Sequence, residues 1–385
     1  MQYRPFGSLG FKVSALGFGC MRLPVCNGDP HAIDRPLALR LLRHAIDQGV
    51  NYLDTAYPYH GGNSEVVVGA ALRDGYRAKV KLVTKLPVWQ VTSPADVDRL
   101  VDEQLRRLGD DHIDFYLIHN LARSTWPLVA QHQILERLEK AQQAGKIGPL
   151  GFSYHDSFDL FKEIVDAYPG WRLAQIQYNY ANETVQAGTR GLAYGAAKGL
   201  AMVIMEPLLG GCLATPPPAV ADIFRQAQPQ RSPVEWALQW LWHKPEVAVV
   251  LSGMGAMAQV EENLAAAGRS GVGQLSGADL EVVQAAFRAY AGTTPIPCTK
   301  CRYCLPCPQK VDIPVAFDLY NGVQAFGGMQ GVLNRIIYQG HLAQNHGGLC
   351  IACGACMKKC PQKIDIITWL RTVHEEMMKK PAVGR

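Results

Sequence analysis

The sequence has few of the features that mark membrane, secreted or nucleic-acid-binding proteins. No window reaches the roughly 18 uninterrupted apolar residues of a membrane span. The N-terminal segment MQYRPFGSLGFKVSALGFG lacks the basic and apolar blocks of a signal peptide. No run of five or more basic residues occurs, although the net charge is +5. We therefore expect a cytoplasmic protein that has neither a membrane nor a nucleic acid as its partner.

Cysteine is scarce over most of the chain and crowded near its end. Three of the eleven cysteines lie before residue 290, and the other eight fall between Cys298 and Cys360 in two tight groups. A secreted disulfide scaffold would be shorter and more evenly cross-linked, whereas paired C-x-x-C groups are typical of metal ligation. The segment from residue 292 onward carries a net charge of +6, which would offset the negative charge of metal-bound thiolates.

The rest of the chain alternates short apolar runs with amphipathic stretches of helix length. One such stretch opens with Asp34, has Pro36 in its first turn and ends at Gly49, as a capped helix does. Eight runs separated by helical intervals predict an α/β fold, a (β/α)₈ TIM barrel, which takes about 250 residues. The runs are residues 15–19, 51–56, 81–86, 114–119, 148–153, 174–179, 202–207 and 247–252.

The 385 residues leave room for a second, smaller domain. Residues 271–297 predict one helix followed by a Thr/Pro linker, which marks a boundary near residue 292. We expect the barrel over residues 1–291 and a small, mainly helical domain that carries both cysteine groups over residues 292–385. Helical stretches over 314–345 separate the two cysteine groups.

Polar residues lie at the ends of successive predicted strands. Asp54, Lys85, His119 and Ser153 follow one another at spacings of 31, 34 and 34 residues, the length of one βα unit. In a (β/α)₈ barrel the carboxyl ends of the strands converge on one face, where active sites form. We therefore expect these side chains to meet at the barrel mouth.

Three of these polar groups, together with a tyrosine in the loop after Asp54, suit the reduction of a carbonyl. Tyrosine, with a reference pKa of about 10, is too weak an acid unless its phenolate is stabilised. Lys85 can do so, Asp54 can hold Lys85 in place, and His119 can orient or polarise the carbonyl. Tyr59 is the predicted proton donor, and Tyr57 is its alternative; the spacing from Asp54 favours Tyr59.

The segments DTAYPYHGGNSEVVVG, KLVTKLP and DFYLIH resemble the active-site motifs of the aldo-keto reductase superfamily, over about residues 2–270. The resemblance implies a barrel that uses NAD(P)H to interconvert a small carbonyl and an alcohol. In this family pattern Tyr59 is the proton donor, Lys85 and Asp54 lower its pKa, and His119 orients the substrate.

The same resemblance implies cofactor contacts in the second half of the barrel. Ser153 and Gln175 match positions that hold the nicotinamide carboxamide, although Tyr154 stands where the family often has Asn. Met205 falls where an aromatic ring often stacks on nicotinamide; a core methionine is the alternative. The implied contacts are Ser153, Gln175, Met205, Pro207, Leu208, Glu262 and Asn263, the last two on adenine.

Two sequence features bear on the choice of cofactor. Gly253 and Gln259 stand where the family has basic residues for the 2′-phosphate, so we expect NADH or a relaxed preference. No G-x-G-x-x-G fingerprint occurs in a βαβ setting, so a Rossmann domain is not supported.

Both cysteine groups have the spacing of ferredoxin ligands. The second run, CIACGACMKKCP, follows C-x₂-C-x₂-C-x₃-C-P, which is the bacterial [4Fe–4S] pattern, and the first is one residue shorter in its last gap. Zinc is the alternative. In two-cluster ferredoxins the fourth cysteine of each run serves the other cluster. That rule predicts one cluster on Cys298, Cys301, Cys304 and Cys360, and another on Cys350, Cys353, Cys356 and Cys307.

These features predict an NAD(P)H-dependent oxidoreductase whose tail, residues 292–385, is a small, mainly helical dicluster ferredoxin-like domain with two [4Fe–4S] clusters. The clusters would exchange electrons with a partner protein, sense redox state or stabilise the domain. An alternative is an electron-transfer or redox-sensing protein whose barrel binds nucleotide without turning over a carbonyl. The complete set of Asp54, Tyr59, Lys85 and His119 favours the enzyme.

Overall fold

The structure is a computed structural model that describes residues 1–29, 31–211, 213–291, 295–296, 298, 304–326, 328–340, 342–360 and 364–379. The chain divides into two compact units. The first comprises Met1–Pro207 and Val234–Gly277, and the second comprises Leu208–Pro233 and Ala278–Arg385. Throughout the described residues, every helix is too short or too polar to cross a membrane.

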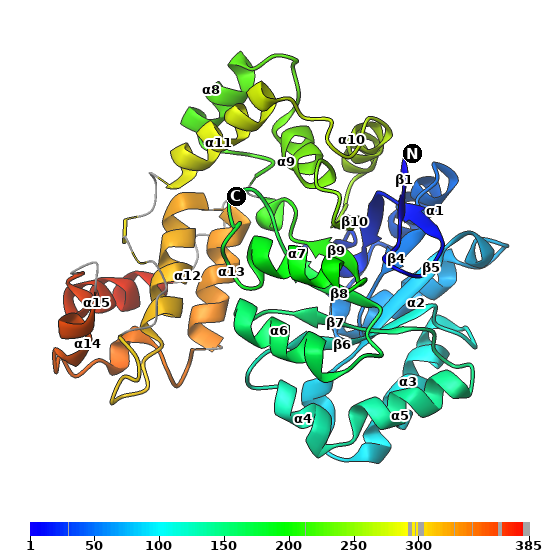
Figure 1. Cartoon of the computed structure of the whole chain (residues 1–385), viewed down its shortest axis with the longest axis horizontal. Coiled ribbons are helices and arrows are strands. Elements are labelled where there is room, and N and C mark those ends of the chain that lie inside the picture. Colours follow the sequence, from blue (N-terminus) through cyan, green and yellow to red (C-terminus); the bar gives the residue numbers. More distant parts are fainter. Residues whose placement is uncertain are drawn as a thin grey trace. The chain divides into compact units, whose positions relative to one another are not determined.

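Within the described residues of the first unit, eight parallel strands close into a barrel (Figure 1). The hydrogen-bonded order is β10-β3-β4-β5-β6-β7-β8-β9, so strands adjacent in sequence are adjacent in the barrel. Each apolar run predicted from the sequence forms one of these strands, and the predicted fold class is confirmed. The strands are β3 (Leu16–Gly19), β4 (Tyr52–Asp54), β5 (Lys81–Leu86), β6 (Phe115–Leu121), β7 (Leu150–Tyr154), β8 (Leu173–Gln177), β9 (Ala201–Met205) and β10 (Val247–Ser252).

Amphipathic helices surround the barrel (Figure 1). The Asp34 side chain caps α1 by accepting a hydrogen bond from the Leu37 backbone at 3.1 Å. Helix α3 ends at Gly109, whose φ of 65° lies in the left-handed region that favours glycine. The elements are α1 (Arg35–Asp47), α2 (Asn63–Ala71), α3 (Pro94–Leu108), α4 (Trp126–Gln131), α5 (Ile134–Gln143), α6 (Phe158–Ala167), α7 (Gly188–Ala197), α9 (Pro233–Trp242), α10 (Met257–Gly268), and the 3₁₀ turns η1 (Cys20–Arg22), η2 (Tyr59–Gly62), η3 (Arg77–Lys79) and η4 (Val88–Gln90).

An apolar plug closes the amino-terminal end of the barrel. Phe6 follows β1 (Tyr3–Pro5), which pairs antiparallel with β2 (Lys12–Ser14), and its buried ring lies 4.9 Å from Phe115 and 5.5 Å from Tyr52. Phe115 and Tyr52 begin β6 and β4. Polar chemistry is therefore left to the opposite end, where the strands finish.

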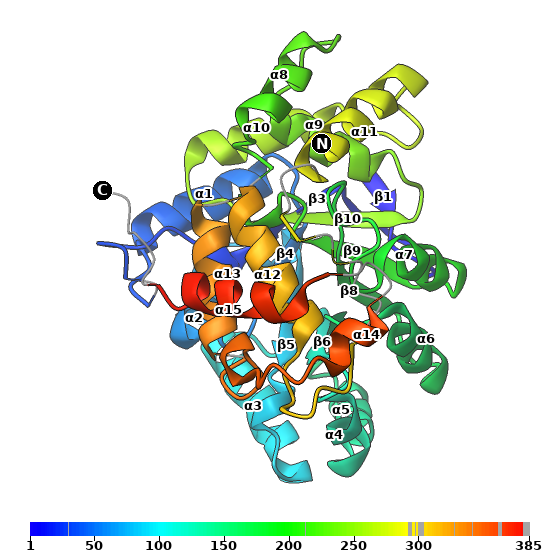
Figure 2. The same ribbon diagram turned by 90° about the vertical axis from the view of Figure 1, so that its left-hand side faces the viewer.

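The second unit is helical in its described part and has its own core. Helices α12 and α13 lie side by side, and α15 packs on both (Figures 1 and 2). Phe317, Tyr338, Leu370 and Val373 are among the side chains buried between these helices. The elements are η5 (Leu209–Gly211), α8 (Pro218–Gln226), α11 (Gly277–Ala291), α12 (Ile313–Phe326), α13 (Gly328–Gly340), η6 (Gly347–Leu349), α14 (Ala355–Lys359) and α15 (Ile366–Met377).

The plug yields a stability prediction. Phe6→Ala removes a fully buried ring and leaves a cavity among aromatic neighbours, so we expect a loss of about 3–5 kcal/mol in the free energy of unfolding. Urea unfolding followed by tryptophan fluorescence measures it. Tyr3→Ala, on the same hairpin, removes a side chain that is 46% exposed and should cost much less. Equal losses in the two variants would contradict the role assigned to Phe6.

Candidate active site

The polar residues predicted from the sequence lie at the carboxyl ends of the barrel strands. Asp54 is the last residue of β4, Lys85 is the penultimate residue of β5, and His119 lies near the end of β6. Parallel pairing puts Asp54 opposite Val83 and Lys85 opposite Leu117. The closed barrel therefore gathers these three side chains at one end.

Lys85 is the centre of the site and is fully buried. Its Nζ atom donates to Asp54 Oδ1 at 2.6 Å and to the Thr55 carbonyl oxygen at 2.7 Å, and lies 3.4 Å from the Tyr59 hydroxyl oxygen. Burial alone would lower the pKa of Lys85, but the charge of Asp54 and the Tyr59 hydroxyl raise it above its ordinary value. The side chain is therefore a buried ammonium aimed at a tyrosine.

Tyr59 opens the η2 turn, five residues after Asp54. Burial raises the pKa of its phenol, the Lys85 charge acts in the opposite direction, and the Asp54 charge adds to the rise. Asp54 therefore favours ionisation of Tyr59 only indirectly, by holding Lys85. At neutral pH the phenol keeps its proton and can donate it.

The rival tyrosine points elsewhere. The Tyr57 hydroxyl donates to the Glu103 carboxylate of α3 at 3.2 Å, and the Arg107 guanidinium lies 4.0 Å from the centre of the Tyr57 ring. The side chain of Tyr57 thus contacts α3, whereas that of Tyr59 contacts Lys85 directly. The geometry thus favours Tyr59 as the acid.

His119 faces Tyr59 across the site. The two ring centres are 6.0 Å apart, and the ring of Trp89, which is 44% exposed, lies 5.2 Å from His119. Burial, the Lys85 charge and His155 hold the pKa of His119 well below its ordinary value. The imidazole is therefore neutral at pH 7 and can form a hydrogen bond to a substrate oxygen without adding a second cation.

Two of the predicted nicotinamide residues retain free hydrogen-bonding capacity. The Ser153 hydroxyl oxygen accepts from the Asn120 backbone at 2.7 Å, which leaves its own proton to donate. The Gln175 side chain acts to lower the pKa of Asp54 against the effect of burial, while its buried Oε1 has no partner within the described residues. A primary amide needs one donor and one acceptor, so this pair fits a carboxamide.

The other predicted cofactor residues differ in how far they are exposed to solvent. Met205 ends β9 and is half-buried, Pro207 is buried, and Leu208 is half-buried. On α10, Asn263 is 3% exposed and its amide donates to the Ser252 hydroxyl at 2.9 Å, whereas Glu262 is exposed. The Asn263 amide thus joins α10 to the end of β10.

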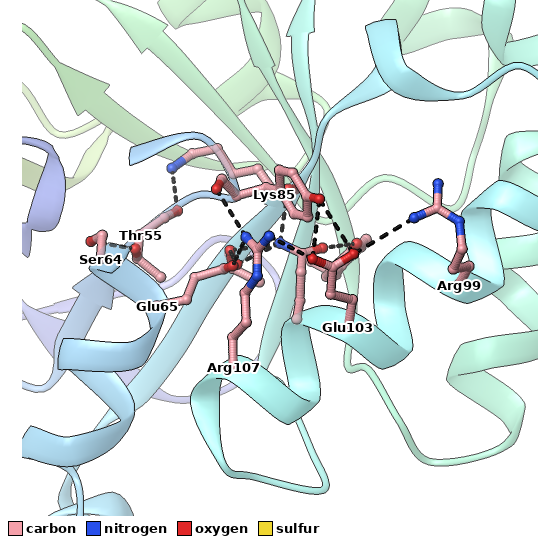
Figure 3. Close-up of polar contacts among 11 residues, drawn as sticks. Thr55, Ser64, Glu65, Lys85, Arg99, Glu103 and Arg107 are labelled. Atoms are coloured by element: carbon pink, nitrogen blue, oxygen red, sulfur yellow. Dashed lines mark hydrogen bonds and ion pairs between the residues drawn. The ribbon is translucent and has the colours of Figure 1, made fainter. Parts of the chain in front are cut away.

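A buried polar network behind Lys85 is not anticipated by the sequence motifs (Figure 3). Glu65, at the start of α2, accepts hydrogen bonds from Thr84 at 2.7 Å and from Gln104 at 2.6 Å. Arg107 of α3 pairs with the same carboxylate at 3.2 Å. One sequence signal was available, because Glu65 begins the otherwise apolar stretch EVVVGAAL, where a charge needs a buried partner.

The cysteines of the second unit lie on its hydrophobic core. Cys298, Cys304, Cys307, Cys350, Cys356 and Cys360 are partly buried against this core, Cys353 is exposed, and Cys301 lies outside the described residues. Thiolates on an apolar surface suit iron–sulfur ligation. Across the part of the chain that the structure describes, no three His, Cys, Asp or Glu side chains converge as a preformed metal site. The partition of the cysteines between clusters stays a prediction.

Comparison with known proteins agrees with both halves of this arrangement. Residues 15–270 match the sequence model of the aldo/keto reductase family, and residues 297–364 match that of the 4Fe-4S dicluster domain. L-galactose dehydrogenase of Arabidopsis thaliana is 29% identical over 287 residues, which cover 69% of this chain and 88% of that protein. NADH-specific methylglyoxal reductase of Escherichia coli is 27% identical over 314 residues, covering 69% and 93%.

A solved structure supports the same assignment. An aldo-keto reductase from Klebsiella pneumoniae, crystallised with NADPH, aligns with a TM-score of 0.61 and 25% identity, covering 74% of this chain and 96% of that one. The family match spans well over half of the residues, and the barrel carries the polar site at its carboxyl end. The chain is an NAD(P)H-dependent oxidoreductase that belongs to the aldo/keto reductase family.

Proposed function

We propose that the chain interconverts a small carbonyl compound and the corresponding alcohol, with Tyr59, Lys85, Asp54 and His119 as its catalytic set. One observation carries the proposal: the Tyr59 hydroxyl lies 3.4 Å from a buried ammonium that Asp54 holds at 2.6 Å. An acid with this support can release its proton to a developing alkoxide and have its phenolate stabilised as it does so.

Each residue has one task in reduction. When bound, reduced nicotinamide would supply a hydride for the carbonyl carbon. Tyr59 gives its proton to the carbonyl oxygen, and the ammonium of Lys85 stabilises the phenolate that remains. Neutral His119 donates a hydrogen bond that orients the same oxygen. In alcohol oxidation the phenolate takes the proton back.

The proposed cofactor site uses the free groups at the ends of β7 and β8. Ser153 and Gln175 would hold the carboxamide of nicotinamide, and Met205 would cover the ring with its polarizable thioether. Pro207 and Leu208 would line the loop that follows, and Glu262 and Asn263 would lie at the adenosine end. These assignments rest on the family pattern together with the unpartnered Oε1 of Gln175.

We expect the protein to prefer NADH over NADPH or to use both cofactors without a strong preference. The Gln259 side chain accepts hydrogen bonds from the backbone of Gly255 and Ala256 and carries no charge toward a 2′-phosphate. Arg22 lies beside Gly253, and its charge is partly offset by Glu206 at 3.9 Å. One relative is NADH-specific by name and a solved neighbour binds NADPH, so the family admits both.

The tail is proposed to hold two [4Fe–4S] clusters on the eight cysteines, in the crossed arrangement of two-cluster ferredoxins. The clusters would exchange electrons with a partner protein or stabilise the second unit. The alternative function is electron transfer or redox sensing with a barrel that binds nucleotide and turns over no carbonyl. The complete Tyr59–Lys85–Asp54 arrangement favours the enzyme over this alternative.

The first prediction concerns the proton donor. Tyr59→Phe removes the acid and keeps the ring, so turnover in carbonyl reduction should fall about 10²–10⁴-fold while cofactor still binds. NADH and NADPH oxidation under anaerobic conditions, with methylglyoxal and a panel of aldehydes and sugars, measures it. Tyr57→Phe is the matched control and should lose far less activity. Near-normal turnover in Tyr59→Phe would overturn the catalytic assignment and favour the binding-only alternative.

The second prediction concerns cofactor choice. The wild-type chain should show no strong NADPH preference, where strong means on the order of 100-fold, or about 2.8 kcal/mol in affinity. Quenching of protein fluorescence by each cofactor gives the two dissociation constants. Gln259→Arg should strengthen NADPH binding by roughly 10-fold and leave NADH binding nearly unchanged, because only NADPH carries the additional phosphate. A strong NADPH preference in the wild type would contradict the prediction.

The third prediction concerns the clusters. Anaerobically purified protein should contain about eight iron and eight sulfide per chain, as expected for two [4Fe–4S] clusters. In the crossed arrangement, Cys360→Ser should damage the same cluster as Cys298→Ser and leave the cluster that Cys353→Ser damages. Electron paramagnetic resonance of the three reduced variants distinguishes the clusters. If the spectrum of Cys360→Ser matched that of Cys353→Ser, each cysteine run would bind its own cluster, and the crossed arrangement would be wrong. Zinc in place of iron in the purified protein would overturn the iron–sulfur assignment.

A further inference from the structure

Glu65 is a buried ionisable group that the proposed reaction does not use. It lies in the first turn of α2 and has no exposed surface. Burial raises the pKa of its carboxyl, while bonds from Thr84 and Gln104 and the charge of Arg107 act in the opposite direction. A buried carboxylate is stabilised only when it is paired and hydrogen-bonded, so its partners indicate what it organises.

One set of partners leads to the strand that carries Lys85. Thr84 precedes Lys85 on β5, so its side chain points out of the barrel while Lys85 points in. The Thr84 hydroxyl donates to Glu65 at 2.7 Å. Gln104 donates both to Glu65 at 2.6 Å and to the Lys85 carbonyl oxygen at 3.1 Å. Glu65 thereby fixes the end of β5 at the residue whose ammonium faces Tyr59.

The other partner leads to the loop that carries Tyr59. Arg107 pairs with Glu65 at 3.2 Å (Figure 3). The same nitrogen of Arg107 donates to the Tyr57 carbonyl oxygen at 3.2 Å. Its second terminal nitrogen contacts Glu103 at 2.5 Å, and Glu103 also accepts from the Tyr57 hydroxyl. The backbone and the side chain of Tyr57 are thus both held, two residues before Tyr59.

The far end of the same loop also lies against Arg107. Gly62 has a φ of 95°, and a Cβ atom at this position would lie 3.0 Å from Arg107 Nη1. The guanidinium therefore contacts the loop on both sides of Tyr59. A planar cation with several donors suits such a multiple contact, and lysine cannot reproduce it.

Both sets of contacts meet at the Glu65 carboxylate. We propose that Glu65 and Arg107 are positioning residues, which together set the separation between the Tyr59 hydroxyl and the Lys85 ammonium. The inference rests on the proposed function and adds to it two residues that touch neither substrate nor cofactor. Loss of the pair frees the loop relative to β5 and leaves the buried Lys85–Asp54 bond intact.

The expected signature follows from the charges around Tyr59. The groups that face it are Lys85 of β5, Asp54 of β4, Cys20 of η1 and His119 of β6. Among them the Lys85 charge lowers the phenol pKa, and its effect weakens with distance. Movement of Tyr59 away from Lys85 therefore raises that pKa further. Alcohol oxidation, which needs the phenolate, then requires a higher pH.

Glu65→Gln is the direct test. The amide keeps an acceptor for Thr84 and Gln104 and removes the charge that holds Arg107. We expect kcat for carbonyl reduction to fall about 10–100-fold, the scale of a catalytic group displaced by about 1 Å. The KM for cofactor should change little, and the pH profile of alcohol oxidation should shift to higher pH. Arg107→Lys should produce the same pattern.

Asp114→Asn is the matched control. Asp114 binds the opposite end of the same strand, through Lys81 at 3.0 Å and the Leu82 backbone at 3.0 Å. Its loss should lower the unfolding temperature without moving the pH profile. If Glu65→Gln and Arg107→Lys both fold, as judged by circular dichroism and cofactor binding, and keep wild-type kcat and pH profile, the inference is wrong.

Testing Glu65→Gln in a chain that already carries Tyr59→Phe distinguishes failure of this inference from failure of the proposed function. In a Tyr59→Phe chain, Glu65→Gln should cause no further loss of the residual rate, because its effect passes through Tyr59. The same fold loss in both backgrounds would overturn the positioning role and indicate a general structural effect. An inactive Tyr59→Phe beside a fully active Glu65→Gln would overturn only the inference. A fully active Tyr59→Phe would overturn the proposed function itself.

Discussion

The buried bond between Lys85 and Asp54 is the constraint on which the site depends. An ammonium with no exposed surface is tolerated only because a carboxylate lies 2.6 Å away and a backbone carbonyl oxygen supplies a further acceptor. The pair exists because β4 and β5 are neighbouring parallel strands, in which Asp54 pairs with Val83 and Lys85 lies two residues further along β5. The barrel therefore supplies both partners, and the pair in turn provides a fixed positive charge for the tyrosine.

Alternation along β5 connects the two sides of the barrel wall. Lys85 points toward the site, and its neighbour Thr84 points toward α2 and α3, where it bonds to Glu65. The site thus has a polar support on the outside of the sheet, among helices that otherwise pack through apolar side chains. The buried polar side chains around the site form many hydrogen bonds, because each buried polar atom needs a partner. Tyr116 bonds to Gln104, and Ser64 bonds to Thr55 and to the Cys20 backbone.

Much of the barrel and its polar rim was predictable from the sequence, because both follow from local patterns. Apolar runs and capped helices gave the strands in their order, and βα spacing put Asp54, Lys85 and His119 at one end. The support could not be predicted, since Glu65 and Arg107 meet only after α2 and α3 dock. The bond from Asn263 to Ser252 depends on tertiary packing in the same way. Residues 208–233 belong to the same unit as the C-terminal residues, although more than forty residues of the other unit lie between them in the sequence. No change in amino-acid composition indicates this division.

The chemistry proposed for the barrel and that proposed for the tail transfer different numbers of electrons. Hydride transfer moves a pair at once, whereas an iron–sulfur cluster moves one, and the sequence carries no flavin motif that would divide the pair. The proposed carbonyl chemistry at Tyr59 therefore needs no electron from the clusters. Six cysteines pack against the core formed by α12, α13 and α15. This packing favours the proposal that bound clusters would stabilise the second unit, whereas an electron-transfer role would in addition require a one-electron partner.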